Sequence, residues 1–399
     1  MRNRAHRFRP ARIRRPAGGR RLTALPLLGA LFLCLCPIQQ ATGVTAPVAP
    51  GRESDAAPPR PRDTDALSSS GTADSHYNLG LALKTKGDLD GAISKYREAL
   101  RKDPDHAEAH HGLGLALKTK GDLDGAIAEY RAALRLRKDW GAVHNNLGVA
   151  LEAKKDLNGA IAEYRAAIRL QPDNAMAHSN LGIALEAKGD LDRAIAAYRT
   201  AIRLQPDNAA AHNNLGLALE SKGDMDNAVA EYRTALRMQA GPTAARYSLN
   251  LGGALHDKGD LEGALGAYRT ALRLQPEDPK THYLVGLVLK AKGDLDAAIA
   301  EYGEALRLQP DNAAAHHHLA SALHDKGDLD AAVAEYREAL RLQPGNATVH
   351  YNLGVAFVAK AQSADAVREF RAFLKLAPST PRNRKMIEQV RAKLAVLAR

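Results

Sequence analysis

Leu-Gly pairs recur along this chain at a nearly constant spacing, and no other feature constrains the fold as strongly. The first five pairs, from Leu79-Gly80 to Leu215-Gly216, lie 34 residues apart, and Leu251-Gly252 follows after 36. Equivalent pairs then return to the 34-residue spacing up to Leu353-Gly354. When each pair is placed at positions seven and eight of a unit, nine units begin at residues 73, 107, 141, 175, 209, 245, 279, 313 and 347. Units of this size cannot bury their apolar side chains alone, so they must stack into an array.

Other positions of the unit are equally constant. Position 20 is Ala in all nine units, and position 24 is Tyr in eight units and Phe370 in the ninth. Position 32 is Pro in seven units, which ends the second of two helices. Between the two helices most units read Lys-Gly-Asp-Leu-Asp, as at 86–90. This sequence is typical of a left-handed glycine that ends one helix and an aspartate that caps the next.

These constant positions resemble those of the tetratricopeptide repeat (TPR), and the resemblance covers residues 73–378. It implies an all-α fold, a right-handed α–α superhelical solenoid of nine TPR units. Apolar side chains continue at helical spacing over 382–398, so we expect residues 379–399 to form a C-terminal capping helix over the last unit. The segment 240–244 interrupts the pattern with two inserted residues, and we expect a hinge there.

The resemblance also locates a candidate binding groove, because the first helices of TPR units line a concave face into which position 6 points. Position 6 is Asn in six units, which resembles the asparagine ladder of O-GlcNAc transferases, where such amides bind the backbone of an extended peptide. The alternative is that these amides bond neighbouring units to one another. Glu at position 12 of three units adds an acidic row that favours a basic or neutral peptide. The predicted groove residues are Asn78, Asn146, Asn180, Asn214, Asn250, Asn352, Glu152, Glu186 and Glu220.

The net charge of +11 does not indicate a nucleic-acid-binding protein, because most of it lies in one short segment. Residues 1–21 contain nine Arg and no acidic residue, and residues 22–43 carry no charge, so 11 − 9 leaves +2 for the remainder. The two cysteines, Cys34 and Cys36, also lie in this N-terminal region. The repeats therefore contain no thiol nucleophile and no cysteine metal site.

The N-terminal region has the order of a secretory signal peptide. Its arginines are followed by the apolar run Leu25–Leu35 and then by Ala41-Thr42-Gly43, whose small residues suit a signal peptidase. We expect residues 1–43 to be this signal and 44–72, rich in Ala, Pro and Ser, to be a disordered linker. An uncleaved N-terminal anchor and an organelle transit peptide are the alternatives. The expected location is the periplasm or cell envelope, with membrane contact only through an uncleaved leader.

Nothing in the repeats predicts catalysis or a cofactor. Eight histidines at position 4, from His76 to His350, are interpreted as structural. A cluster of His317, His318 and His324 could take zinc or nickel, but packing is the favoured interpretation and we expect no metal. The sequence thus predicts an exported scaffold, not an enzyme, that holds a partner protein or extended peptide and no small-molecule substrate. The alternative is a partner or substrate-recognition subunit of an O-GlcNAc-transferase-like glycosyltransferase.

Overall fold

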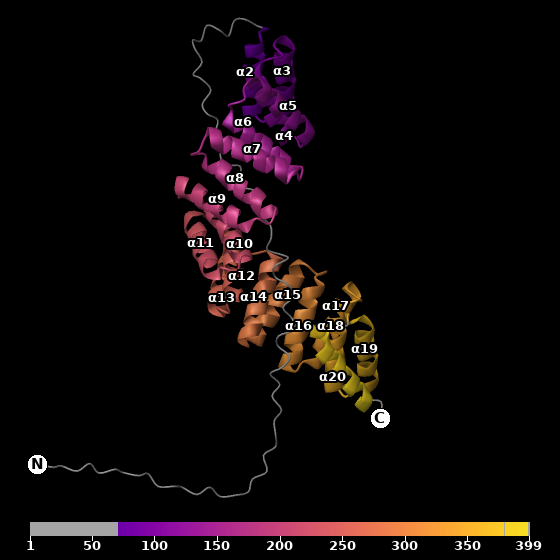
Figure 1. The fold of residues 1–399 in the computed structure, drawn as a ribbon. Helices are drawn as coiled ribbons and strands as arrows, with labels where there is room; N and C mark the ends of the chain where they lie inside the picture. Colours follow the sequence, from indigo (N-terminus) through magenta and orange to yellow (C-terminus); the bar gives the residue numbers. More distant parts are fainter. Residues whose placement is uncertain (1–70, 379, 398–399) are drawn as a thin grey trace, which may run out of the picture. The chain divides into compact units, whose positions relative to one another are not determined.

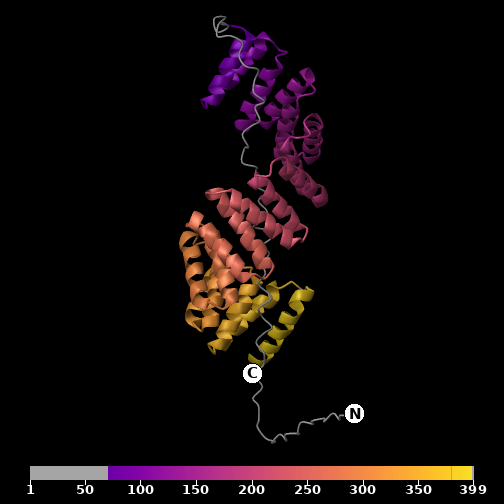
Figure 2. The ribbon, with the colours of Figure 1, turned by 90° about the vertical axis from the view of Figure 1, so that its left-hand side faces the viewer.

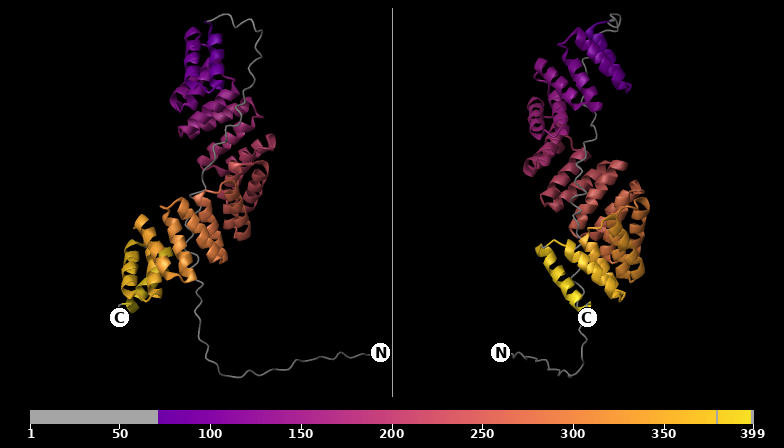
Figure 3. Two further views of the ribbon diagram at one scale, coloured as in Figure 1. Left: turned by 180° about the vertical axis from the view of Figure 1, so that it is seen from behind. Right: turned by 90° about the vertical axis from the view of Figure 1, so that its right-hand side faces the viewer.

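A computed structural model describes residues 71–378 and 380–397, and within these residues every regular element is an α-helix. Figure 1 shows the helices following one another as antiparallel pairs in chain order, and Figures 2 and 3 show the same order from other sides. None of the helices in the described ranges is both long and apolar enough to span a lipid bilayer. The predicted leader and the predicted linker up to residue 70 lie outside the described residues, whereas Thr72, the last linker residue, caps the start of α2.

Each of the nine predicted units is one helical hairpin. The hairpins are α2 (Ala73–Thr85) with α3 (Leu89–Lys102), α4 (Ala107–Thr119) with α5 (Leu123–Leu136), α6 (Gly141–Ala153) with α7 (Leu157–Leu170), α8 (Ala175–Ala187) with α9 (Leu191–Leu204), α10 (Ala209–Ser221) with α11 (Met225–Met238), α12 (Pro242–Asp257) with α13 (Leu261–Leu274), α14 (Pro279–Lys292) with α15 (Leu295–Leu308), α16 (Ala313–Lys326) with α17 (Leu329–Leu342), and α18 (Ala347–Ala359) with α19 (Ser363–Leu376). A last helix, α20 (Pro381–Leu397), follows.

The turn inside each hairpin forms as its sequence predicts. In the first unit Gly87 has a positive φ of 85°, and the Asp88 side chain accepts a hydrogen bond of 2.9 Å from the main-chain N–H of Gly91. Two units lack the glycine, and there Lys155 and Ala361 adopt positive φ angles of 67° and 58°. The packing of the two helices thus imposes the left-handed turn even on residues that disfavour it.

A buried aromatic ring fixes the distance between the two helices of each unit. In the fourth unit the ring of Tyr198 on α9 is fully buried against Gly182 on α8. A Cβ atom added to Gly182 would lie 2.5 Å from that ring, which is closer than atoms pack in proteins. The constant Leu-Gly pair is therefore a consequence of the tyrosine sixteen residues further along the chain.

Consecutive hairpins pack on one another, and one apolar cluster runs from the first unit to the eighth while a second runs from the eighth unit to α20. At its C-terminal end α20 packs on α19, with Val390 buried and Met386, Ile387 and Leu394 beside it. The prediction of an all-α solenoid of nine units with a capping helix is confirmed. The two inserted residues of the sixth unit lengthen its first helix, because α12 has 16 residues and begins at Pro242, directly after Gly241 at φ 73°.

Candidate functional site

The asparagines at position 6 join neighbouring units. In four units the side chain at position 6 donates a hydrogen bond to the side chain at position 5 of the preceding unit, and we call each such bond an inter-repeat rung. The rungs run from Asn146 Nδ2 to His111 Nε2 (3.1 Å), Asn180 Nδ2 to Asn145 Oδ1 (3.1 Å), Asn250 Nδ2 to Asn213 Oδ1 (2.8 Å) and Asn352 Nδ2 to His317 Nε2 (2.9 Å). The geometry supports the alternative that the sequence left open, in which these amides bond units to one another.

The asparagines at position 6 differ in their burial. Asn180, Asn214 and Asn250 are buried, whereas Asn146 and Asn352 are half-buried. Asn78, in the first described unit, has no described unit before it, and its side chain is exposed. Contact between these amides and a peptide backbone stays a prediction, and at the rungs one amide N–H is already in use.

Of the five position-6 asparagines that follow a described unit, Asn214 is the one that makes no rung. Position 5 of the fourth unit is Ser179, whose hydroxyl is too short to reach Asn214 on the fifth unit, in the way that Asn145 reaches Asn180. Ser179 is 2% exposed and Asn214 is 1% exposed, and among the described residues neither Ser179 Oγ nor Asn214 Nδ2 has a hydrogen-bond partner. The junction between α8 and α10 therefore holds two buried polar atoms that face no partner.

The three predicted groove glutamates occupy equivalent, half-buried places on α6, α8 and α10. Each Oε2 accepts a hydrogen bond from the buried tyrosine hydroxyl of its own unit. The pairs are Tyr164 to Glu152 (2.9 Å), Tyr198 to Glu186 (2.8 Å) and Tyr232 to Glu220 (2.7 Å). Burial raises the pKa of all three carboxyl groups above the usual range, although the tyrosine bonds act in the opposite direction.

The glutamates share a helix face with position 5 of the rungs. Asn145 and Glu152 are seven residues apart, as are Asn213 and Glu220, and residues at this spacing lie two turns apart on one side of a helix. We call the set of Glu152, Glu186 and Glu220 the acidic row. Position 12 is Lys118 in the unit before the row and His256 in the unit after it. Glutamate at position 12 is therefore limited to the third, fourth and fifth units, and Asp257 of the sixth unit adds a further carboxylate near Glu220.

The histidine cluster of the eighth unit consists of packing residues. His317 and His318 are each 7% exposed, and their rings pack against Tyr336 and Tyr302. Burial lowers the pKa of His317 to about 4 and that of His318 to about 3. A neutral His317 is also what its rung requires, because its Nε2 accepts a hydrogen bond from Asn352. Across the described ranges no group of three or more His, Cys, Asp or Glu side chains is arranged to hold a metal ion.

Sequence reasoning missed the position-5 partners of the rungs. Their signal is a spacing of 35 residues, one more than the period, which joins position 5 of one unit to position 6 of the next. It also missed the carboxylate partners of the position-4 histidines. Their signal is a glutamate 19 residues after the histidine in six units.

Two family models match this array. One, described as tetratricopeptide repeat, matches residues 77–143 and 179–244, and the other, described as TPR repeat, matches 153–189, 252–293, 286–327 and 320–360. A search of curated proteins found no match.

Solved structures with similar helical arrays include those of MamA, YrrB and PilF. MamA is 32% identical, with 40% of this chain and 94% of MamA aligned at a TM-score of 0.39. YrrB, described as a TPR protein with an unusual peptide-binding site, is 23% identical over 50% of this chain and 97% of its own, with a TM-score of 0.43. PilF of Pseudomonas aeruginosa is 24% identical over 51% of this chain and 92% of its own, with a TM-score of 0.46.

Proposed function

Because the chain belongs to the tetratricopeptide-repeat family, we propose that it is a scaffold that holds a partner polypeptide and not an enzyme. The constant residues of its units are all used in packing, in turns and in helix ends. The residues that vary between units lie on the first helices, where solenoid repeats present their binding surface. The proposal therefore places the contact with the partner on these helices.

The acidic row carries the proposal. In each of Glu152, Glu186 and Glu220 the tyrosine hydroxyl binds Oε2, and a carboxylate can accept further hydrogen bonds through its other oxygen. A cation placed at such a half-buried carboxylate interacts more strongly than it does on an open surface, because less water screens the pair. We therefore expect the partner segment to carry lysine or arginine side chains.

The repeat geometry limits where those cations lie. The first helices of neighbouring units contact one another, and packed helices have axes roughly 8–10 Å apart. A peptide in the polyproline II conformation advances roughly 3.1 Å per residue with three residues per turn, so about three residues span one unit and every third side chain points to the same side. A peptide that lies along α6, α8 and α10 would thus place every third side chain beside a member of the acidic row. Between the third and fourth units a rung from Asn180 to Asn145 lies beside the row.

Synthetic peptides test this proposal. A peptide of about ten residues with lysine at every third position should bind the full chain, and one with glutamate at those positions should not. Exposed ion pairs contribute roughly 0.2–1 kcal/mol each, so the triple variant Glu152→Gln, Glu186→Gln, Glu220→Gln should bind about tenfold more weakly. Glu338→Gln, which removes an exposed carboxylate of α17 paired with Arg341, is the matched control and should bind normally. Equal binding of both peptides, or undiminished binding by the triple variant, would contradict the proposal.

We also propose that the chain is exported to the periplasm or cell envelope. This proposal depends on the Arg-rich segment, the apolar run Leu25–Leu35 and the small residues at 41–43, all of which lie outside the described residues. Nothing in the described residues favours the alternative of a glycosyltransferase subunit.

A further inference from the structure

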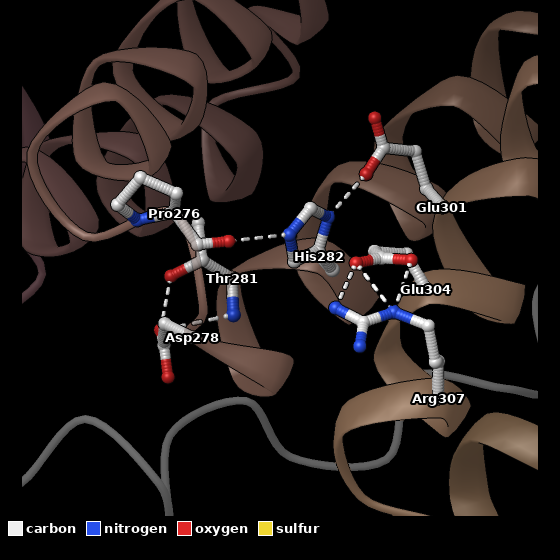
Figure 4. A network of polar contacts seen from close by, with 7 residues as sticks. All are labelled: Pro276, Asp278, Thr281, His282, Glu301, Glu304 and Arg307. Carbon is white, nitrogen blue, oxygen red and sulfur yellow. Dashed lines mark hydrogen bonds and ion pairs between the residues drawn. The ribbon is translucent and has the colours of Figure 1, made fainter.

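Six of the histidines at position 4 have both ring nitrogens beside an oxygen atom. Nδ1 lies 2.5–2.7 Å from Oε2 of the glutamate at position 23 of the same unit. Nε2 lies 2.9–3.2 Å from the main-chain carbonyl oxygen six residues earlier in the chain. Figure 4 shows this arrangement in the seventh unit. The six histidines are His110, His144, His212, His282, His316 and His350.

The two oxygen partners require a protonated pair. A carbonyl oxygen only accepts hydrogen bonds, and so does an ionised carboxylate. A neutral imidazole has one N–H, so it can donate to one of these oxygens but turns a lone pair towards the other. Both contacts are hydrogen bonds only when the histidine and glutamate together hold one additional proton, which makes the ring an imidazolium beside a carboxylate.

Each such histidine joins three segments of the chain. In the seventh unit His282 lies on α14, Glu301 lies on α15, and Pro276 lies in the connection that follows α13 of the preceding unit. The ring therefore fastens the two helices of its own unit to each other and to the connection from the unit before. We propose that three of these histidines, His144, His212 and His282, are pH-dependent clamps, closed while protonated and opened by deprotonation, so that the junctions before their units loosen as the pH rises.

The charges around the rings favour the closed form. In the seventh unit Glu304 of α15 also lies near His282 and is held by Arg307 at 2.6 Å, while Asp278 caps α14 through Thr281. Burial opposes a charge on His282, but the bonds to Glu301 and to the carbonyl of Pro276 outweigh it, and the pKa of His282 is raised.

The third and fifth units agree. The hydrogen bond to Glu163 is the largest effect on the pKa of His144, which is raised although burial and Arg169 on α7 oppose it. The bond to Glu231 in the same way raises the pKa of His212 against burial and Arg237 on α11.

The sign of the pH dependence follows from these raised pKa values. A histidine whose pKa is higher in the folded chain stabilises the fold fully at pH values below its ordinary pKa of about 6.5. That contribution is lost as the pH rises through the folded-state pKa. The clamps are therefore closed in mildly acidic solution and open in alkaline solution.

Three of the nine units lack this clamp: in the first, position 23 is Lys95 and His76 contacts Glu98 instead, and the other two serve as internal references. In the fourth unit His178 Nε2 contacts the carbonyl oxygen of Pro172 at 3.1 Å, but position 23 is Ala197 and offers no carboxylate. In the sixth unit position 4 is Ser248, whose hydroxyl donates to the carbonyl of Ala244 in its own helix. The connections before these two units should respond less to pH than those before the third, fifth and seventh units.

Hydrogen exchange on the full chain tests the proposal. Amide protection in the connection 138–143, corrected for the intrinsic effect of pH on exchange, should fall about tenfold between pH ~5.5 and pH ~8.5 relative to the connection 172–177. Glu163→Gln keeps the shape of the side chain and can donate to a neutral ring, so it should abolish this fall. It should also lower the titration midpoint of His144 in NMR spectra of the imidazole ring.

A gain-of-function variant completes the test. Ala197→Glu supplies the carboxylate that the fourth unit lacks and should give the connection 172–177 the same pH dependence, measured against the sixth unit at 239–244. The proposal is overturned if protection at 138–143 follows that at 172–177 at every pH. It is also overturned if Glu163→Gln leaves the pH dependence unchanged.

Discussion

Restoring the missing rung should stabilise the junction between the fourth and fifth units. In the native chain Ser179 Oγ and Asn214 Nδ2 are buried without a described partner, and a buried polar group left unpaired costs about 1–3 kcal/mol. Ser179→Asn places an amide oxygen where Asn145 and Asn213 already carry one in the neighbouring units. One net hydrogen bond is worth about 0.5–1.5 kcal/mol, and the relief of the Asn214 donor adds to it. We expect a total gain of roughly 1–2 kcal/mol. The larger asparagine side chain should fit at position 179, because asparagine already occupies the equivalent position 5 at Asn145 and Asn213.

A double-mutant cycle and a reverse variant measure this gain. Because a repeat array opens locally, the free energy is best obtained from native-state hydrogen exchange of the amides in α8 and α10. The gain should disappear when Ser179→Asn is combined with Asn214→Ala, since the bond then has no donor. Asn145→Ser should create the same mismatch at Asn180 and cost about as much as the first variant gains. If Ser179→Asn has no effect or destabilises, and Asn145→Ser is tolerated, the rungs do not stabilise the junctions and the reasoning fails.

Three further predictions follow from the fold and the sequence. Gly182→Ala should destabilise by about 1–3 kcal/mol, measured by urea denaturation, because its Cβ would lie 2.5 Å from the ring of Tyr198; an unchanged transition would contradict this. Amides at 238–246 should exchange faster than those at the equivalent connection 204–210, because Ala240 replaces the usual proline ending and Ser248 replaces the position-4 histidine; equal protection would argue against a hinge. N-terminal sequencing of the native protein should find Val44 at or near the start, whereas an intact N-terminal methionine would rule out cleavage.

The repeat period was enough to predict the helices and their pairing. A spacing of 34 residues, a Leu-Gly pair and a tyrosine sixteen residues after the glycine specify one hairpin, because a Cβ atom at the glycine would crowd the ring; the eighth unit, with Ala320 before Tyr336, is the exception. The turn at Lys155 shows that this specification tolerates exceptions. Its sequence lacks the expected glycine, yet the chain takes a positive φ of 67° because both helices are already held by the core.

The candidate site was less predictable, because its decisive contacts cross from one unit to the next. Asn180 was expected at a groove face, but its amide donates to Asn145 of the unit before, and only the orientation of neighbouring hairpins shows this. The histidines at position 4 were interpreted as packing residues for a similar reason. Their protonation depends on a carbonyl oxygen in the connection, such as that of Pro276 beside His282, and sequence spacing does not show which ring nitrogen faces it.

The mismatch at Ser179 also bears on how such a gene can change in length. Near-identical units recombine readily, and each exchange removes or adds whole copies. Loss of residues 175–208, the entire fourth unit, would bring Asn145 opposite Asn214, and these side chains form the same amide pair that Asn145 now makes with Asn180. A chain one copy shorter would therefore have no unpaired amide at this point. Loss of the fourth unit can therefore improve the junction that remains. A chain with eight units made in this way should have a free energy of unfolding per residue no lower than that of this chain.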